Sequence, residues 1–195
     1  MIILVDMDDT MEQLLAAWIR GVNERYGTDT AYEEILSWDV SAAFPGLTHD
    51  QVYAIPEESG FWGTVDPMPG AAEALERLIA AGHEVYIVTA ATHESLSEKM
   101  TDLLFRWFPF ISWDHVIITS RKQMIRGDVL IDDGIHNLEG GSYAKILMTA
   151  PHNVHYDAES AGMIRVRNWD EIEEAVRKLE QDGVRPSAGS GGQQN

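Results

Sequence analysis

Cysteine is absent from the 195 residues of this chain. Its absence excludes disulfide bonds, thiol catalysis and zinc sites built from cysteine ligands. Basic residues are scarce as well, because 14 Lys and Arg stand against 32 Asp and Glu, which gives a formal net charge of −18 with histidine neutral. Such a field opposes binding to nucleic-acid polymers and to anionic membranes. A small phosphorylated ligand remains compatible with it, since a metal ion and one lysine can reverse the potential locally.

Long apolar runs are missing too. None of the apolar segments approaches the ~20 residues that a membrane-spanning helix needs, and the first predicted strand begins at residue 2, where a secretion signal would otherwise start. We therefore expect a cytoplasmic protein. A homodimer is compatible with the sequence, which does not fix the oligomeric state.

Short apolar segments alternate with helical periodicities along most of the chain. Strands are predicted at 2–5, 85–88, 116–118 and 129–131, with edge strands at 146–148 and 164–166. Amphipathic helices are predicted at about 15–26, 71–79, 96–107 and 172–179. This alternation is typical of an α/β fold with a doubly wound parallel sheet.

One long stretch interrupts this pattern. From about 28 to 66 the chain is rich in turns, short helical pieces and aromatic residues, and it contains no clear strand. We interpret it as a small helical insertion after the first strand. The expected organisation is an α/β core at 1–12 and 66–183, a helical cap at 13–65, and a disordered, glycine-rich tail at 184–195.

Polar side chains follow four of the predicted strands, at the point where each strand ends. They are Asp6, Asp8 and Asp9 after the first strand, Thr89 (followed by Ala90) after the second, Lys122 after the third, and Asp132 and Asp133 after the fourth. Ligands of open parallel sheets bind beyond the carboxyl ends of the strands, so we expect these groups to form one site. Crowded carboxylates repel one another, and a hard cation such as Mg²⁺ would remove that conflict.

The residue types at these strand ends suit phosphoryl transfer. One carboxylate can attack phosphorus and hold it as an acyl-phosphate, while a second protonates the leaving oxygen and later activates water. Mg²⁺ can screen the charge between the attacking carboxylate and the phosphate. A threonine hydroxyl, loop N–H groups and a lysine ammonium can stabilise the phosphate oxygens as charge develops.

In chain order, these groups resemble the four motifs of the haloacid dehalogenase superfamily of phosphohydrolases. The motifs are Asp6-Met7-Asp8-Asp9-Thr10, Thr89, Lys122 and Asp132-Asp133, and the resemblance runs from residue 2 to about 170. The segments 5–8, 67–70, 119–122, 128–133 and 149–155 are further similar to the 5'(3')-deoxyribonucleotidase family. That resemblance implies a Rossmann-like core, a small helical cap, dependence on Mg²⁺ and removal of phosphate from nucleoside monophosphates.

The same resemblance implies a role for each motif residue. Asp6 becomes the nucleophile and a metal ligand, and Asp8 becomes the acid/base, with its backbone carbonyl also on the metal. Asp133 becomes the third protein ligand of Mg²⁺, and Asp132 lies beside it as a ligand or as a neighbour of the ligands.

The phosphate and the leaving group have implied binding residues as well. The resemblance implies that Thr89 and Lys122 bind the phosphate, together with N–H groups near Asp8 and Ala90. The chain has Ala90 where the family tends to have a second serine or threonine, and Asp9 where it often has glycine. A substrate pocket in the cap is expected to be lined by Leu14, Trp38, Phe61 and Trp62, with Leu14 standing where characterised animal enzymes have an aromatic residue.

Simpler interpretations of the same residues remain open. Asp6 and Asp8 could form a solvated turn, Thr89 could cap a helix, and Lys122 could be a surface lysine. The three aromatic residues of the expected pocket could instead form the core of the cap, and His152 and His155 could belong to a surface loop.

The leading prediction is an Mg²⁺-dependent phosphatase for small phosphate monoesters that works through an aspartyl-phosphate, with nucleoside monophosphates as favoured substrates. The alternatives are a phosphatase of another small metabolite, such as a sugar phosphate, and a phosphate-binding relative without catalysis.

Overall fold

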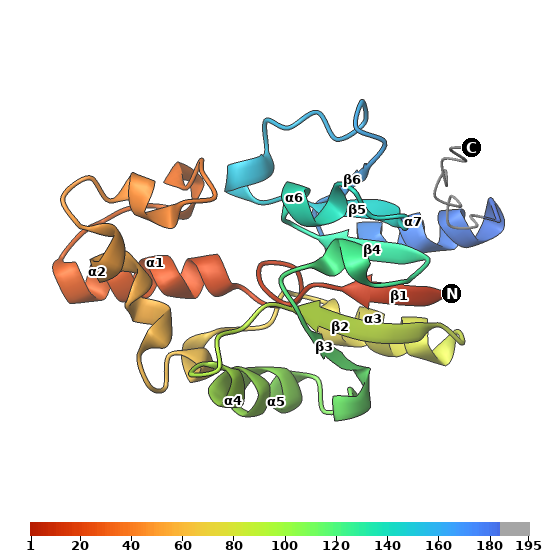
Figure 1. The fold of residues 1–195 in the computed structure, drawn as a ribbon, viewed down its shortest axis with the longest axis horizontal. Coiled ribbons are helices and arrows are strands. Elements are labelled where there is room, and N and C mark those ends of the chain that lie inside the picture. The colour runs from red at the N-terminus through yellow and green to blue at the C-terminus, as the bar shows by residue number, and fades with distance from the viewer. Residues whose placement is uncertain (184–195) are drawn as a thin grey trace, which may run out of the picture.

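Six parallel strands form one sheet in the order β3–β2–β1–β4–β5–β6 in the computed structural model, which describes residues 1–183 (Figure 1). The strands are β1 (Ile2–Val5), β2 (Glu84–Thr89), β3 (Val116–Ile118), β4 (Val129–Asp132), β5 (Ala144–Met148) and β6 (Ile164–Val166). The predicted doubly wound sheet is confirmed, and its strand order changes direction between β1 and β4.

The prediction that 146–148 is an edge strand is wrong. β5 pairs with β4 on one side and with β6 on the other, so β3 and β6 form the two edges. Ile146, Leu147 and Met148 are all buried. A continuous apolar run of this kind is typical of an inner strand with both faces covered. The predicted segment has only three residues, which is too short to distinguish an inner strand from an edge strand in the sequence.

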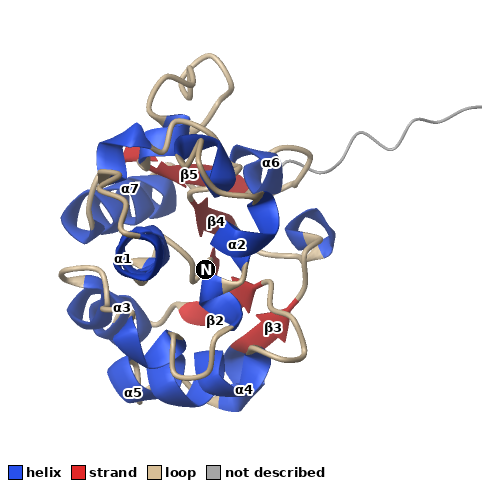
Figure 2. Cartoon of the chain, turned by 90° about the vertical axis from the view of Figure 1, so that its left-hand side faces the viewer, coloured by secondary structure: helices blue, strands red, loops and turns tan. Residues whose placement is uncertain are grey.

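Side chains of each strand alternate between two hydrophobic layers. Ile3 and Val5 of β1 point into the larger layer, whereas Leu4 points into the smaller one. Helices α3 (Ala71–Ala80) and α7 (Trp169–Gln181) cover the first face, and the short helix α6 (Ile135–Leu138) covers the other, as Figure 2 shows. Because the helices cover both faces of the sheet, a ligand can approach it at the carboxyl ends of the strands.

The helix predicted at 96–107 is irregular. It begins with α4 (Leu96–Glu98), continues as a π-helix (Lys99–Leu104) and ends with α5 (Phe105–Trp107). The wider π-turn brings Lys99 into the interior of the protein, where only 1% of its surface is exposed. Turns of this kind are frequent at functional sites.

The insertion after β1 consists of helices α1 (Leu14–Tyr26) and α2 (His49–Tyr53) with short 3-10 helices between and after them. Further 3-10 helices lie elsewhere in the chain, and together they span Tyr32–Glu34, Val40–Ala43, Ile55–Glu57, Trp62–Thr64, Trp113–His115, Lys122–Met124 and Pro151–Asn153. Within 13–65, which the structure describes throughout, there is no strand. Figure 1 shows α1 and α2 beyond the carboxyl ends of the strands. The division into a core and a cap remains a prediction.

In the part of the chain that the structure describes, none of the helices combines the length and the apolarity that crossing a bilayer requires. The tail predicted to be disordered, 184–195, lies outside the described residues.

Candidate active site

The site lies where β1 and β4 end side by side. The N–H of Asp6 donates a hydrogen bond of 2.9 Å to the carbonyl of Ile131, which continues the pairing of the two strands by one residue. Asp132 is the last residue of β4, and Asp133 follows it. The parallel register therefore brings carboxylates from distant parts of the sequence to one edge of the sheet, as predicted.

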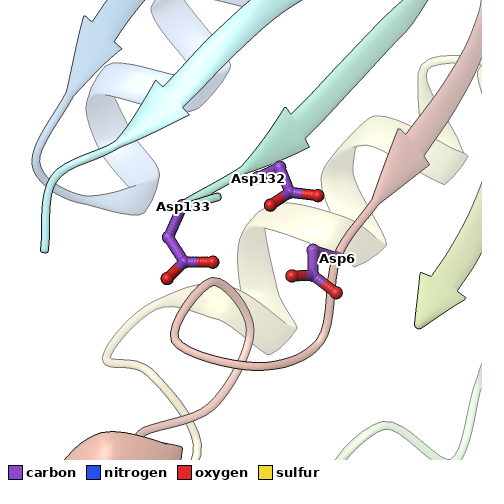
Figure 3. A group of neighbouring side chains, drawn as sticks. All are labelled: Asp6, Asp132 and Asp133. Atoms are coloured by element: carbon purple, nitrogen blue, oxygen red, sulfur yellow. The ribbon is translucent and has the colours of Figure 1, made fainter. Parts of the chain in front are cut away.

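Asp6, Asp132 and Asp133 form a buried acidic cluster. One carboxylate oxygen from each residue lies within 4.8 Å of the others, and Figure 3 shows the three side chains converging on the space beyond β1 and β4. Buried carboxylates at such distances destabilise one another unless a cation lies among them.

Lys122 supplies one such cation. Its Nζ lies 2.6 Å from Oδ1 of Asp6 and 2.7 Å from Oδ2 of Asp132. Burial alone would lower the pKa of Lys122, but the carboxylates of Asp6 and Asp132 outweigh it and raise that pKa above its usual value. Lys122 is 2% exposed, so the interpretation as a surface lysine is excluded.

The two consecutive aspartates at the end of β4 have different partners. Oδ1 of Asp132 accepts hydrogen bonds from the N–H of Gly134 at 2.7 Å and from the side chain of Asn137 at 3.1 Å, while its Oδ2 faces Lys122. Both oxygens of Asp132 are therefore engaged by the protein. Asp133 meets the side chain of His152, whose Nε2 lies 3.2 Å from its Oδ2. Asp133 is the better placed of the two to bind an ion.

The environment of Asp6 opposes its negative charge. Burial, followed by the neighbouring Asp132 carboxylate, raises the pKa of Asp6 to about 7, although Lys122 acts in the opposite direction. Burial also raises the pKa of Asp132 and of Asp133 above their ordinary values. The cluster thus carries more negative charge than Lys122 can balance, and the hard carboxylate oxygens of Asp6 and Asp133 fit a magnesium ion.

This raised pKa predicts a pH-dependent effect of replacing Asp6 by asparagine. Between pH 3.8 and about 7 the folded protein holds a proton on Asp6 that the unfolded chain releases, so the contribution of Asp6 to stability falls as the pH rises through this window. Without metal, the free energy of unfolding of Asp6→Asn minus that of the wild type should therefore increase from pH 4 to 7. Above pH 7 this difference should stay constant. Urea unfolding at several pH values measures the difference; a difference independent of pH would contradict the assignment.

Asp8 has a different environment from Asp6. Nζ of Lys99 lies 2.7 Å from Oδ2 and 2.6 Å from Oδ1 of Asp8. Burial alone would raise the pKa of Asp8, but the Lys99 ammonium outweighs it and holds that pKa below its usual range. The pKa values of the two aspartates of the first motif are therefore shifted in opposite directions: pairing with Lys99 favours the ionised form of Asp8, whereas burial favours the neutral form of Asp6.

Thr89 ends β2 and is fully buried. Its Oγ1 accepts a hydrogen bond of 2.9 Å from Lys99 and donates one of 3.2 Å to the carbonyl of Ala90. The next helix, α4, begins at Leu96 after the N-cap residue Ser95, so Thr89 does not cap a helix.

Asp9, which the sequence left without a chemical role, shapes the turn into α1. Its φ of +52° lies in the left-handed region, where glycine is favoured and aspartate is tolerated better than most residues. Its carboxylate oxygens accept hydrogen bonds of 3.0 and 3.2 Å from the N–H of Leu15 in the first turn of α1. This conformation and this capping bond account for aspartate at a position where glycine is frequent.

Glu12 is a further buried acid that the sequence did not single out. It is fully buried, and neither of its carboxyl oxygens accepts a hydrogen bond from the described residues. Its carboxyl group lies beside that of Asp8, so the neutral form of Glu12 can donate a hydrogen bond to the Asp8 carboxylate. Burial, followed by the negative charge of Asp8, raises the pKa of Glu12 well above its ordinary value. These surroundings favour the neutral form of Glu12.

A cavity of about 220 Å³ opens between the strand ends and the insertion. The strand ends and the loops that follow them contribute a mostly polar wall, formed by Asp6, Asp8, Asp9, Ala90, Ser120, Lys122, Asp133, His136, Asn137 and His152. The insertion contributes a mostly apolar wall formed by Leu14, Leu15, Trp18, Ile35, Ser37, Trp38, Val40 and Tyr53. An apolar enclosure with converging polar groups is the usual form of a small-molecule site.

The residues expected to line the substrate pocket fall into two groups. Leu14 and Trp38 line the cavity. Phe61 and Trp62 lie outside its lining and are buried in the hydrophobic core, as the alternative interpretation of these aromatics proposed. Trp38 is 57% exposed and thus is not a core residue.

Besides Glu12, the sequence analysis missed two buried side chains at the site, those of Lys99 and His152. Lys99 was not recognised in the sequence as a site residue, because a lysine in a predicted amphipathic helix usually lies on the solvent-exposed face. A surface loop was one possible place for His152, but only 8% of its side chain is exposed and it contacts Asp133. Its ring also lies edge-on to Trp38, with ring centroids 5.1 Å apart.

Comparison with known proteins agrees with this geometry. The family model described as "5' nucleotidase, deoxy (Pyrimidine), cytosolic type C protein" matches residues 1–181. The chain is 36% identical over 180 residues to a 5'(3')-deoxyribonucleotidase of Bacillus subtilis (strain 168), covering 91% of this chain and 98% of the relative. It is 31% identical over 175 residues to a 5'(3')-deoxyribonucleotidase of Clostridium acetobutylicum, covering 90% and 94%.

Solved structures show the same fold at lower sequence identity. A predicted phosphatase from Clostridium acetobutylicum superposes with a TM-score of 0.63 at 13% identity, covering 91% of this chain and 98% of the other. A haloacid dehalogenase family hydrolase from Deinococcus radiodurans R1 gives a TM-score of 0.60 at 19% identity, and the match covers 95% of this chain and 97% of the other. With a family model that spans nearly all described residues, the chain is a phosphoric monoester hydrolase and belongs to the 5'(3')-deoxyribonucleotidase family.

Proposed function

We propose that the protein is an Mg²⁺-dependent 5'(3')-deoxyribonucleotidase that hydrolyses nucleoside monophosphates through an aspartyl-phosphate on Asp6. The observation that carries the proposal is the convergence of Asp6, Asp8 and Lys122 at the floor of one cavity with an apolar wall. The names of the curated relatives support the same activity.

Asp6 is proposed as the nucleophile and as one ligand of Mg²⁺. Both of its close contacts, with Lys122 and with the N–H of Met7 at 2.7 Å, fall on Oδ1, so Oδ2 is the oxygen that we expect to attack phosphorus. Asp133 and the backbone carbonyl of Asp8 are the other proposed protein ligands, with Asp132 holding Lys122 beside them. The ion, when bound, neutralises the charge between the attacking carboxylate and the phosphate.

Asp8 is proposed as the acid and base of the reaction. It lines the cavity two residues after the nucleophile, and it belongs to the same turn. Asp8 is ionised beside Lys99 in the free protein, so it first takes up a proton when a protonated phosphate monoester binds. It gives that proton to the oxygen of the departing nucleoside in the first step, and in the second step it takes one from the water that hydrolyses the aspartyl-phosphate. The two steps return Asp8 to the protonated state in which the first step began.

The phosphate oxygens are proposed to bind Lys122 and the N–H of Ala90, two residues that line the cavity. The hydroxyl of Thr89 is the third proposed donor, and it must turn from the carbonyl of Ala90 to reach the phosphate. Lys122 is the cation nearest to Asp6 in the cavity, which suits it to stabilise charge that develops during transfer. Alanine at position 90 leaves this part of the site with one hydroxyl where the family tends to have two.

The nucleoside is proposed to occupy the apolar part of the cavity. Trp38 stands at its edge, with ring centroids 4.5 Å from His136 and 5.1 Å from His152, both edge-on. An aromatic group of this kind can stack on a nucleobase, and Leu14 at the start of α1 adds apolar surface to the same cavity. The word "cytosolic" in the description of the matched family supports a cytoplasmic location for the enzyme.

Phosphate release from a panel of substrates tests the proposal. The panel holds nucleoside 5'- and 3'-monophosphates, in ribose and deoxyribose forms, and several sugar phosphates, each with and without Mg²⁺. We expect Mg²⁺-dependent release from deoxynucleoside monophosphates above all others. Release confined to sugar phosphates would keep the chemistry and remove the nucleotidase assignment, and binding of phosphate without any release would support a relative that has lost catalysis.

Replacing Trp38 by alanine tests the proposed contact with the base. The loss of one aromatic contact should raise KM for a nucleoside monophosphate by about 3- to 10-fold. KM for ribose phosphate, which has no base, should change little. Trp113→Ala is the matched control, because Trp113 is similarly exposed and lies outside the cavity. Equal changes in KM for both substrates would contradict a role for Trp38 in binding the base.

A further inference from the structure

Lys99 is a buried cation that the mechanism above leaves without a task. Its ammonium contacts both oxygens of Asp8 and donates hydrogen bonds of 2.9 Å to Oγ1 of Thr89 and 3.1 Å to the carbonyl of Ala90. An ammonium has three N–H donors, and the side chain of Asp8, the hydroxyl and the carbonyl use all of them. The end of β1 and the end of β2 are thus joined through one lysine.

The surroundings of Lys99 hold it in this position. It begins the π-helix, and its Nζ lies 4.9 Å from the centre of the Trp62 ring of the insertion. The preceding residue, Glu98, accepts hydrogen bonds of 2.9 Å from the hydroxyl of Ser59 and 2.8 Å from the N–H of Gly60. The insertion therefore packs on the lysine from one side, while Asp8 lies between the lysine and the cavity.

We propose that Lys99 is a positioning residue that fixes the carboxylate of Asp8 for proton transfer to the leaving group. This inference rests on the proposed function, in which Asp8 is the acid. Asp8 is 29% exposed along its side chain, so without Lys99 its carboxylate can rotate toward the water of the cavity. Proton transfer needs the donor within hydrogen-bonding reach of the leaving oxygen, and a small misplacement lowers the rate steeply.

A purely structural role for Lys99 makes a different prediction. If the lysine only neutralised a buried carboxylate, its removal would slow the hydrolysis of all substrates alike. If it orients the acid, the loss depends on how much the leaving group needs a proton. The 5'-alkoxide of a nucleoside needs one, whereas p-nitrophenolate leaves without protonation, and kcat/KM reports the steps up to that departure.

The absence of cysteine allows a direct test. In Lys99→Cys the new thiol is the only one in the chain, so alkylation of the unfolded variant with 2-bromoethylamine, followed by refolding, rebuilds an ammonium at this one position. Lys178→Cys, on the exposed side of α7, is carried through the same treatment as the control. Lys99→Met, which keeps an unbranched apolar chain of similar volume in the buried site, is the second variant if the cysteine variant does not fold.

We expect kcat/KM for a nucleoside 5'-monophosphate to fall about 100-fold in Lys99→Cys or Lys99→Met. This is about the rate enhancement that a correctly positioned general acid contributes. With p-nitrophenyl phosphate the loss should be less than about 10-fold, and aminoethylation should recover most of the nucleotide activity. The control should show wild-type rates before and after treatment.

Equal losses with both substrates, or no loss with either, would overturn the inference, provided that circular dichroism and thermal unfolding show a folded variant. A wild-type protein that hydrolyses neither substrate would instead overturn the proposed function, and the inference with it. The wild-type measurement therefore distinguishes the two failures.

Discussion

Asp6→Asn is expected to lower the rate of phosphate release by at least about 10⁴-fold, as the loss of a nucleophile does in enzymes with covalent intermediates. Asparagine has nearly the same shape as aspartate, but its amide cannot form an acyl-phosphate. The fold should persist, because the substitution removes a charge that burial and Asp132 oppose. Steady-state phosphate release and circular dichroism measure the two effects.

The matched control for this variant is Asp182→Asn. Asp182 follows α7, is exposed and lies outside the cavity, so the same chemical change there should leave turnover unaltered. Turnover by a folded Asp6→Asn protein would place the nucleophile elsewhere. Loss of the fold in Asp6→Asn would show that Lys122 needs Asp6 as well as Asp132.

Removal of Mg²⁺ is the second change with a large expected effect. Chelation should lower turnover by about 10³-fold or more, since a bound ion supplies several kcal/mol of transition-state stabilisation, and added Mg²⁺ should restore it. Mg²⁺ should also raise the melting temperature of the protein, because an ion that binds only the folded state stabilises it.

The pH dependence of this stabilisation follows from Asp6. An ion must displace the proton from a carboxyl whose pKa is raised to about 7, so the shift in melting temperature at a fixed Mg²⁺ concentration should grow from pH 5 to about 7 and then level off. A shift of equal size at every pH, or one that survives unchanged in Asp6→Asn, would place the ion away from the cluster of Asp6, Asp132 and Asp133.

The sequence predicted the features that depend only on where each strand ends and on which residues follow it. β1 (Ile2–Val5) is an apolar strand followed by Asp6, and β4 (Val129–Asp132) is an apolar strand that ends in Asp132. The carboxyl ends of neighbouring parallel strands lie at the same edge of the sheet, so these carboxylates are expected to meet. The cluster of Asp6, Asp132 and Asp133 was therefore predictable from the order of the residues alone.

The parts that were missed depend on contacts between distant segments. Lys99 and Asp8 are 91 positions apart, and their contact needs a π-turn that no local periodicity indicated. Phe61, Trp62 and Trp38 are all aromatic residues of the insertion, yet packing buries the first two and leaves only Trp38 at the cavity. The composition of a segment shows that it has aromatics, whereas the way it folds decides which of them face a ligand.

The chemical state of Asp6 during turnover tests the account most directly. A nucleoside monophosphate radiolabelled in its phosphate is mixed with the Mg²⁺-loaded protein, the reaction is quenched in acid, and the protein is digested to locate the label. We predict acid-stable label on the peptide that contains Asp6, removed by a chase with unlabelled substrate and absent from Asp6→Asn. Label on a peptide that lacks Asp6, or release of labelled phosphate by the folded Asp6→Asn protein, would contradict the proposed mechanism.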